Sequence, residues 1–173
     1  VGGCCGTTPM HTSRMRALCD KHSGTYRGNK DRLAEKTEPE TLTLTGLEAF
    51  RYGSGDFVVV GERCNVAGSR KFLRLISEKK YDEALDIARI QVEHGAMVVD
   101  VNMDDGLLDT KAEMTAFLNM LMSDPSVCRV PVMIDSSVFD IVEAGLKCCQ
   151  GKCIVNSISL KQGEEAFISN ALR

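Results

Sequence analysis

The sequence predicts an α/β fold in which parallel strands alternate with helices over residues 57–173. Short apolar runs recur along this region, and a segment with helical periodicity follows each run. Continuously apolar strands joined by helices are typical of a parallel sheet with right-handed crossovers. Four such units would form the first half of a TIM-type (β/α)8 barrel. A short doubly wound sheet is the other architecture that fits the pattern.

The four strands are expected where the apolar runs lie, at 57–60, 97–102, 130–135 and 153–158. Between the first two strands, residues 81–95 show an amphipathic helical pattern that ends at Gly95.

Later helices are predicted from their start signals. Thr110 and Glu113 have the spacing of a capping box. Ser136 or Ser137 is expected to cap the next helix, with Val138 facing inward. A last helix begins after the fourth strand.

The region before residue 57 has a different composition. Residues 1–22 form a glycine-cysteine turn followed by a helix, with Thr8 as N-cap and Pro9 at the first helical position. Residues 23–56 are polar and rich in turn residues, which indicates an interdomain linker with a short strand at 41–45. The start within a glycine-rich turn suggests a piece of a longer protein.

Composition narrows the function classes. The chain has 173 residues, enough for one medium domain, and its net charge of −3 with no basic stripe argues against nucleic acid. No apolar run is long enough for a membrane span, and no secretory leader appears.

Of the 8 cysteines, four lie in two adjacent pairs, an awkward geometry for disulfides. We therefore expect a reducing, cytoplasmic setting with most thiols as small apolar residues.

Polar residues follow every predicted strand, at the edge where parallel sheets bind ligands. The candidate binding residues are Glu62, Asn65, Asp100, Asn102, Asp135 and Asn156. Together they predict one pocket that recognises a heterocycle with N–H groups along one edge. Taken singly, Asp135 could instead cap a helix, and Asn156 could satisfy a local turn.

The cysteines offer a second candidate site. Cys4 and Cys5 lie beside a helix N-terminus, where thiolates are favoured and soft metals bind. Zinc needs three or four protein ligands, so the residues alone leave a zinc site and a structural role both open. Cys149 and Cys153 are four residues apart across Gly151 and are expected to be structural.

Several motifs, taken together, are similar to one family. "VGGCCGTTP" resembles the end of the homocysteine-binding barrel of the cobalamin-dependent methionine synthase family. "GERCNVAGSRKF", "DVNMDDGLLD", "MIDSS" and "GKCIVNSIS" resemble the start of its folate-binding, pterin-binding barrel. The resemblance covers essentially the whole chain in the order of the family.

The resemblance implies a domain arrangement and a reaction. Residues 1–22 would end the homocysteine and zinc barrel, 23–56 would be the linker, and 57–173 would be the first half of the folate barrel. The implied enzyme moves the N5 methyl group of 5-methyltetrahydrofolate to cob(I)alamin, held by another module of the parent chain, and then to homocysteine.

The resemblance also implies roles for single residues. Cys4 and Cys5 match two of three zinc thiolates, and the third would precede Val1. Asp135 and Asn156 match positions that bind the pterin ring.

The other candidates have less direct roles in the resemblance. Glu62 and Asn65 match the loop after the first strand of the folate barrel. Asp100 and Asn102 would lie near the same pocket.

Other functions remain open at this stage. One is a different pterin enzyme, either similar to dihydropteroate synthase or a corrinoid-dependent methyltransferase. Another is a non-catalytic zinc or thiol module. The chain alone is expected to be catalytically inert because half of the barrel and the cobalamin module are missing. The open sheet edges predict self-association.

Overall fold

The structure is a computed structural model that describes residues 6–22, 41–53 and 55–173. The chain divides into two compact units, Val1–Pro39 and Glu40–Arg173. In the first unit, α1 (Pro9–His22) begins at the proline that the Thr8–Pro9 pair predicts. Cys4 and Cys5 lie outside the described residues.

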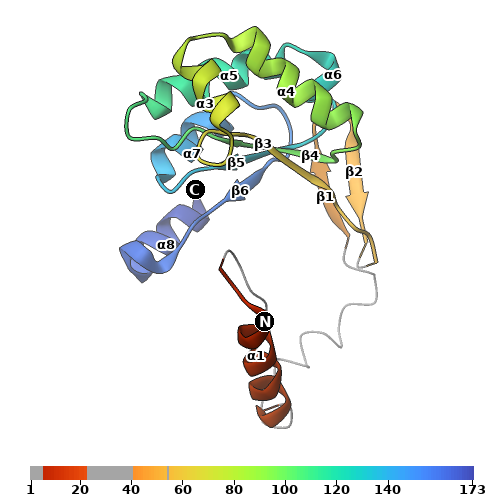
Figure 1. The fold of residues 1–173 in the computed structure, drawn as a ribbon, viewed down its shortest axis with the longest axis vertical. Helices are drawn as coiled ribbons and strands as arrows, with labels where there is room; N and C mark the ends of the chain where they lie inside the picture. The colour runs from red at the N-terminus through yellow and green to blue at the C-terminus, as the bar shows by residue number, and fades with distance from the viewer. Residues whose placement is uncertain (1–5, 23–40, 54) are drawn as a thin grey trace. The chain divides into compact units, whose positions relative to one another are not determined.

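The second unit contains a four-stranded parallel sheet (Figure 1). Its strands are β3 (Val60–Asn65), β4 (Val98–Asn102), β5 (Val132–Asp135) and β6 (Ile154–Asn156), and their order in the sheet is their order in the chain. Each crossover therefore places a strand beside the one before it, as in a barrel. The predicted class is confirmed: the fold is α/β, consistent with a partial TIM-type barrel.

Helices connect the strands and form a layer on the sheet (Figure 1). They are α3 (Arg70–Ser77), α4 (Tyr81–Glu93), α5 (Thr110–Met122), α6 (Pro125–Cys128) and α7 (Phe139–Leu146), and after β6 come the 3-10 turn η1 (Leu160–Gln162) and α8 (Glu164–Leu172). The core lies between the helices and the sheet. At its centre Phe72 and Phe117 pack edge to face with ring centroids 5.2 Å apart. Among the described residues, no helix combines the length and apolar character needed to cross a bilayer.

A hairpin contributes a second, smaller core. Strands β1 (Leu42–Thr45) and β2 (Ala49–Tyr52) pair antiparallel, so the strand predicted at 41–45 is present. Leu44 and Tyr52 of the hairpin are buried together with Val98 of β4. Part of the segment predicted to be a linker therefore packs on the amino-terminal half of the sheet.

The first strand of the sheet begins later than the sequence pattern predicts. Strand β3 starts at Val60, opposite Val98, and runs to Asn65. Its register shifts between Gly61 and Cys64, which marks a β-bulge. Pairing with β4 determines where β3 begins. The apolar residues 57–59 lie before Val60, the first residue of β3 that has a partner in β4.

The predicted capping box of α5 is wrong. Asp109 is the N-cap, and its side chain accepts a hydrogen bond from the Ala112 N–H at 3.2 Å. Glu113 is instead buried, with its carboxylate bound to Lys79 and Tyr81. The local spacing does not reveal this tertiary partner.

The predicted cap of α7 is also wrong. Val138 occupies the N-cap position without a side-chain cap and is 47% exposed rather than buried. Ser136 and Ser137 lie in the preceding turn, where a carboxylate from another loop binds both.

Candidate functional site

Four of the predicted site residues form one row across the ends of the strands. Asn65 pairs with Asn102, Asn102 with Asp135, and Asp135 with Asn156 in the register of the sheet. Laterally paired residues of neighbouring strands project to the same face of a sheet. We call these four residues the polar row. Its place at the carboxyl ends of parallel strands is the usual position of a ligand site in such folds.

The ends of the polar row are held by further backbone hydrogen bonds. The Val66 N–H donates to the carbonyl of Asn102 at 3.0 Å, and the Ser136 N–H donates to the carbonyl of Asn156 at 2.8 Å. Pairing thus continues through the row, so the relative heights of its side chains are fixed by the sheet.

Two asparagines of the polar row lie beside carboxylates of the site. The Asn65 side-chain oxygen accepts from the Gly68 N–H at 2.9 Å, and the Asn65 side chain lowers the pKa of Asp100 against the larger effect of burial. The Asn102 side-chain oxygen accepts from the Asp104 N–H at 2.8 Å, and the Asn102 side chain lowers the pKa of Asp135 in the same way. Since backbone N–H groups engage both oxygens, the amide nitrogens are the groups left to face the carboxylates.

Asp100 lies two residues before Asn102 on β4, on the same face as the polar row. It is 3% exposed, and its Oδ1 atom has no hydrogen-bond partner in the part of the chain that the structure describes. A buried acceptor without a partner is costly, which points to a ligand or water that donates to it.

Burial and neighbouring carboxylates raise the pKa values of Asp100 and Asp135. Burial, followed by the charges of Asp135 and Glu62, raises the pKa of Asp100 to about 7. Burial also raises the pKa of Asp135, with smaller contributions from the charges of Asp104 and Glu62. Such a site favours a neutral ligand with N–H donors, or a cation, over an anion.

Glu62 and Asn156 are less enclosed than the other predicted site residues. Glu62 lies in the bulge of β3 and is exposed, although its charge acts on both aspartates. Asn156 lies on the edge strand β6 and is also exposed. The structure thus brings all six predicted binding residues to one end of the sheet, with Asp100 and Asn102 as the buried centre of this group.

Asp104 is a rim residue whose role is not evident from the sequence. Its carboxylate accepts from the Ser136 hydroxyl at 2.7 Å, the Ser137 N–H at 2.7 Å and the Ser137 hydroxyl at 2.8 Å. It therefore ties the loop after β4 to the loop after β5. In the sequence, this contact could have been inferred from the polar loop that follows one predicted strand and the pair of serines that follows the next.

The predicted metal ligands Cys4 and Cys5 lie outside the described residues. Within the described ranges, no group of three or more His, Cys, Asp or Glu side chains is arranged to hold a metal ion. The carboxylates at the strand ends therefore do not form a metal cluster.

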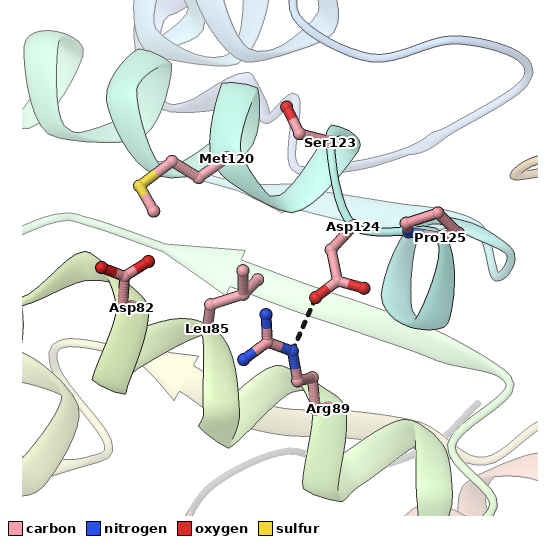
Figure 2. Close-up of a pocket in the computed structure, with 7 residues that line it drawn as sticks. All are labelled: Asp82, Leu85, Arg89, Met120, Ser123, Asp124 and Pro125. Atoms are coloured by element: carbon pink, nitrogen blue, oxygen red, sulfur yellow. Dashed lines mark hydrogen bonds and ion pairs between the residues drawn. The ribbon is translucent and has the colours of Figure 1, made fainter.

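A separate open cavity of about 440 Å³ lies in the helix layer between α4 and the α5–α6 junction (Figure 2). Arg89 crosses it and donates to Asp124 at 2.6 Å and to Asp86 at 2.5 Å. Two charged residues that line the cavity, Arg89 and Asp124, are thus already paired with each other. We place the candidate site at the strand ends, where a buried acceptor remains without a partner.

Comparison with known families identifies the family of this part of the chain. The family model for pterin binding enzymes matches residues 61–172, a range that includes the whole polar row and all of the sheet except Val60. The chain belongs to the pterin-binding enzyme family.

Proposed function

We propose that the chain supplies part of the pterin site of a cobalamin-dependent methionine synthase. The observation that carries this proposal is the polar row, whose four residues are paired in register, beside the buried Oδ1 atom of Asp100, which has no hydrogen-bond partner among the described residues. Membership of the pterin-binding family supports the ligand class. The sequence motifs at both ends of the chain favour this reaction over other pterin chemistry.

The donor and acceptor pattern of the row suits the edge of a pterin. That edge carries a ring N–H, an amino group and a carbonyl. The Asp135 carboxylate can accept two parallel N–H bonds, as carboxylates do from guanidine-like groups. The Asn156 amide can donate to the carbonyl, and the free Oδ1 of Asp100 provides a further acceptor.

The proposed reaction transfers the N5 methyl group of 5-methyltetrahydrofolate. N5 is a tertiary amine and a poor leaving group, so it must gain a proton or a strong hydrogen bond as the methyl group departs. The corrinoid, when bound by its own module, supplies the nucleophile that accepts the methyl group. The strand ends of this chain hold the ring in position and form no covalent bond with it.

The proposal extends to the domain arrangement. Residues 1–22 would end a homocysteine barrel with Cys4 and Cys5 as zinc thiolates, 23–56 would join the domains, and 57–173 would begin the folate barrel. Since both cysteines lie outside the described residues, this part rests on the sequence resemblance alone. All six cysteines within the described ranges are free thiols, which suits a reducing cytoplasm.

Calorimetric titration with 5-methyltetrahydrofolate tests the proposal. We expect saturable binding by the chain and at least about tenfold weaker binding by Asp135→Asn and Asn156→Ala, the effect of losing about 1.4 kcal/mol. Asp140→Asn is the matched control, because this exposed aspartate lies on α7 outside the polar row. The control should bind like the unchanged chain.

Each other outcome has a distinct meaning. Equal binding by all variants would exclude the polar row as the pterin site. Preference for a dihydropterin pyrophosphate would favour a function like that of dihydropteroate synthase. Tight stoichiometric zinc without folate binding would favour a zinc or thiol module. No binding of any of these would show that the four strands do not hold a pterin without the rest of a barrel.

A further inference from the structure

The β-bulge of β3 determines which side chain of this strand reaches the polar row. Pairing with β4 stops after Gly61, opposite Val99, and resumes at Cys64, opposite Val101. Residues 62–63 of β3 therefore lie opposite the single residue of β4 between these two partners. The bulge thus adds one residue to β3 relative to its neighbour.

The added residue decides which face of the sheet the last side chains of β3 occupy. Side chains alternate between the two faces of a strand, so a shift by one residue moves every later side chain to the other face. With the bulge, Asn65 pairs with Asn102 in the polar row, and Cys64 is buried in the core under the helices. Gly61 faces α4. Regular alternation from that position would turn Cys64 toward the polar row and Asn65 toward the helices.

A glutamine of the helix layer binds the bulge. Gln91 lies on α4, and its Oε1 atom accepts from the Arg63 N–H at 2.7 Å. Arg63 is a bulge residue without a register partner in β4, so this side chain takes the place of the missing strand partner. The Gln91 Nε2 atom donates to Cys64 Sγ at 3.3 Å and to the Ile87 carbonyl at 3.1 Å. One amide thus connects α4 with two consecutive residues of β3.

Gly61 leaves the room that the glutamine occupies. A Cβ atom at Gly61 would lie 2.8 Å from Gln91 Oε1 and 3.2 Å from Gln91 Cβ. A side chain at this position would therefore push the amide away from the Arg63 N–H. The close approach of strand and glutamine shows that the bulge and Gln91 fit each other.

The bulge has a second effect on the candidate site. It contains Glu62, an exposed carboxylate at the same end of the sheet. Burial is the main cause of the raised pKa values of Asp100 and Asp135, and the charge of Glu62 adds to it. The conformation of the bulge therefore influences both the shape and the charge of the site.

We propose that Gln91 is a positioning residue of the binding site, which holds the bulge of β3 so that Asn65, and not Cys64, faces the ligand. Gln91 lies on the helix side of the sheet, so it acts on the ligand only through the Arg63 backbone and the register of β3. The inference rests on the proposed function for the identity of the ligand, a pterin. The role of Gln91 in the register of β3 rests on the hydrogen bonds alone.

Labelling of the native chain with iodoacetamide, followed by peptide mapping, tests the register. Trypsin releases Cys64 in peptide 64–70 and Cys128 in peptide 112–129, each with a single cysteine. Both thiols are buried, and Cys128 reports any opening of the core that is unrelated to the bulge. Gln91→Met keeps a side chain of similar length without the acceptor oxygen. It should raise the labelling rate of Cys64 at least about tenfold relative to that of Cys128.

Two further variants separate the hydrogen bond from other effects. Gln91→Glu keeps an oxygen for the Arg63 N–H, so the ratio of Cys64 to Cys128 labelling should stay close to that of the unchanged chain. Glu93→Gln is the matched control, because this residue is exposed on the same helix. The proposal is overturned if Gln91→Met leaves the ratio unchanged, or if Gln91→Glu exposes Cys64 as much as Gln91→Met does.

Calorimetric titration with 5-methyltetrahydrofolate distinguishes a failure of this inference from a failure of the proposed function. We expect Gln91→Met to bind at least about tenfold more weakly than the unchanged chain, and Glu93→Gln to bind equally well. Equal binding by the unchanged chain and Gln91→Met would overturn the role of Gln91 in the site and leave the proposed function standing. If neither protein binds, although Cys64 is exposed in Gln91→Met, the proposed function fails and the role of Gln91 in the register of β3 stands.

Discussion

Ser136 donates a hydrogen bond of 2.7 Å to Asp104, joining the loops that follow two neighbouring strands. Ser136 is 1% exposed, so this contact lies inside the molecule beneath the rim of the candidate site. The Asp104 carboxylate also binds the backbone and the hydroxyl of Ser137. One side chain therefore determines how the loops after β4 and β5 meet above the polar row.

Replacing Asp104 should loosen this junction. Asp104→Ala removes three hydrogen bonds and leaves the buried Ser136 hydroxyl without its acceptor, so we expect a loss of about 1–3 kcal/mol in the free energy of unfolding. Urea denaturation of Asp104→Ala and of the unchanged chain measures this loss in the free energy of unfolding. Asp140→Asn, on the exposed side of α7, should change stability by less than about 0.5 kcal/mol. Equal stability of Asp104→Ala and the unchanged chain would show that the junction is not structural.

Asp100 should make stability depend on pH. Its pKa is about 7 in the folded chain and about 3.9 when unfolded, so between these values the folded state binds more protons. Stability from this group is therefore complete below about pH 4 and is lost as pH rises through about 7. Asp100→Asn should remove this contribution to the dependence of the unfolding free energy on pH. Denaturation midpoints measured across this pH range test the expectation. Parallel pH profiles for the two proteins would contradict the shifted pKa.

A second variant checks the cause of that shift. The charge of Asp135 is one of the groups that raise the pKa of Asp100. Asp135→Asn should therefore lower the Asp100 pKa, as followed by NMR titration of the carboxyl carbon. An unchanged titration midpoint in Asp135→Asn would mean that the charge of Asp135 does not contribute to the raised pKa of Asp100.

The buried Glu113 provides a third prediction. Its Oε2 accepts from the Tyr81 hydroxyl at 2.8 Å, and its side chain is almost inaccessible to solvent. Tyr81→Phe removes a donor to a charged acceptor, so we expect a loss of about 1.5–3 kcal/mol in unfolding free energy. Thr115→Ala is the control, because its hydroxyl makes an exposed bond within α5. A loss no greater than that of the control would show that Lys79 alone satisfies the carboxylate.

Gly46 provides a fourth prediction. A Cβ atom there would lie 2.5 Å from the carbonyl oxygens of Cys128 and Val130, where the β1–β2 turn meets the loop before β5. Because backbone cannot rotate away as a side chain can, Gly46→Ala should destabilise the chain by about 1–3 kcal/mol. Gly55→Ala, where nothing lies within 4 Å, is the matched control for thermal denaturation. Similar melting temperatures for both variants would contradict this close approach.

The sequence was sufficient to predict the fold class and most of the candidate site. Apolar runs of strand length separated by helical periods specify alternating strands and helices, and helical connections between continuously apolar strands are typical of a parallel sheet. Polar residues at the ends of those runs fall at one edge of such a sheet whatever its exact register. Asn102, Asp135 and Asn156 could therefore be assigned to one site without coordinates.

Other features depended on contacts between distant residues. Glu113 has the spacing of a capping residue, yet it binds Lys79 of the turn before α4 and Tyr81 at the start of α4. Ser136 resembles a helix cap, yet it donates to Asp104, 32 residues away. The residue type determines which hydrogen bonds a side chain can make, whereas tertiary packing determines which partner lies within hydrogen-bonding distance.

By itself, the sequence determined the alternation of strands and helices and the polar character of the strand ends, whereas the order of the strands in the sheet came from the structure. Only the tertiary structure decided the bulge in β3, the hairpin beneath the sheet and the row from Asn65 to Asn156. It also decided the buried position of Asp100 and hence its raised pKa. The physical reason is that periodicity is a local property, whereas register, burial and mutual charge arise when segments distant in the chain are packed together.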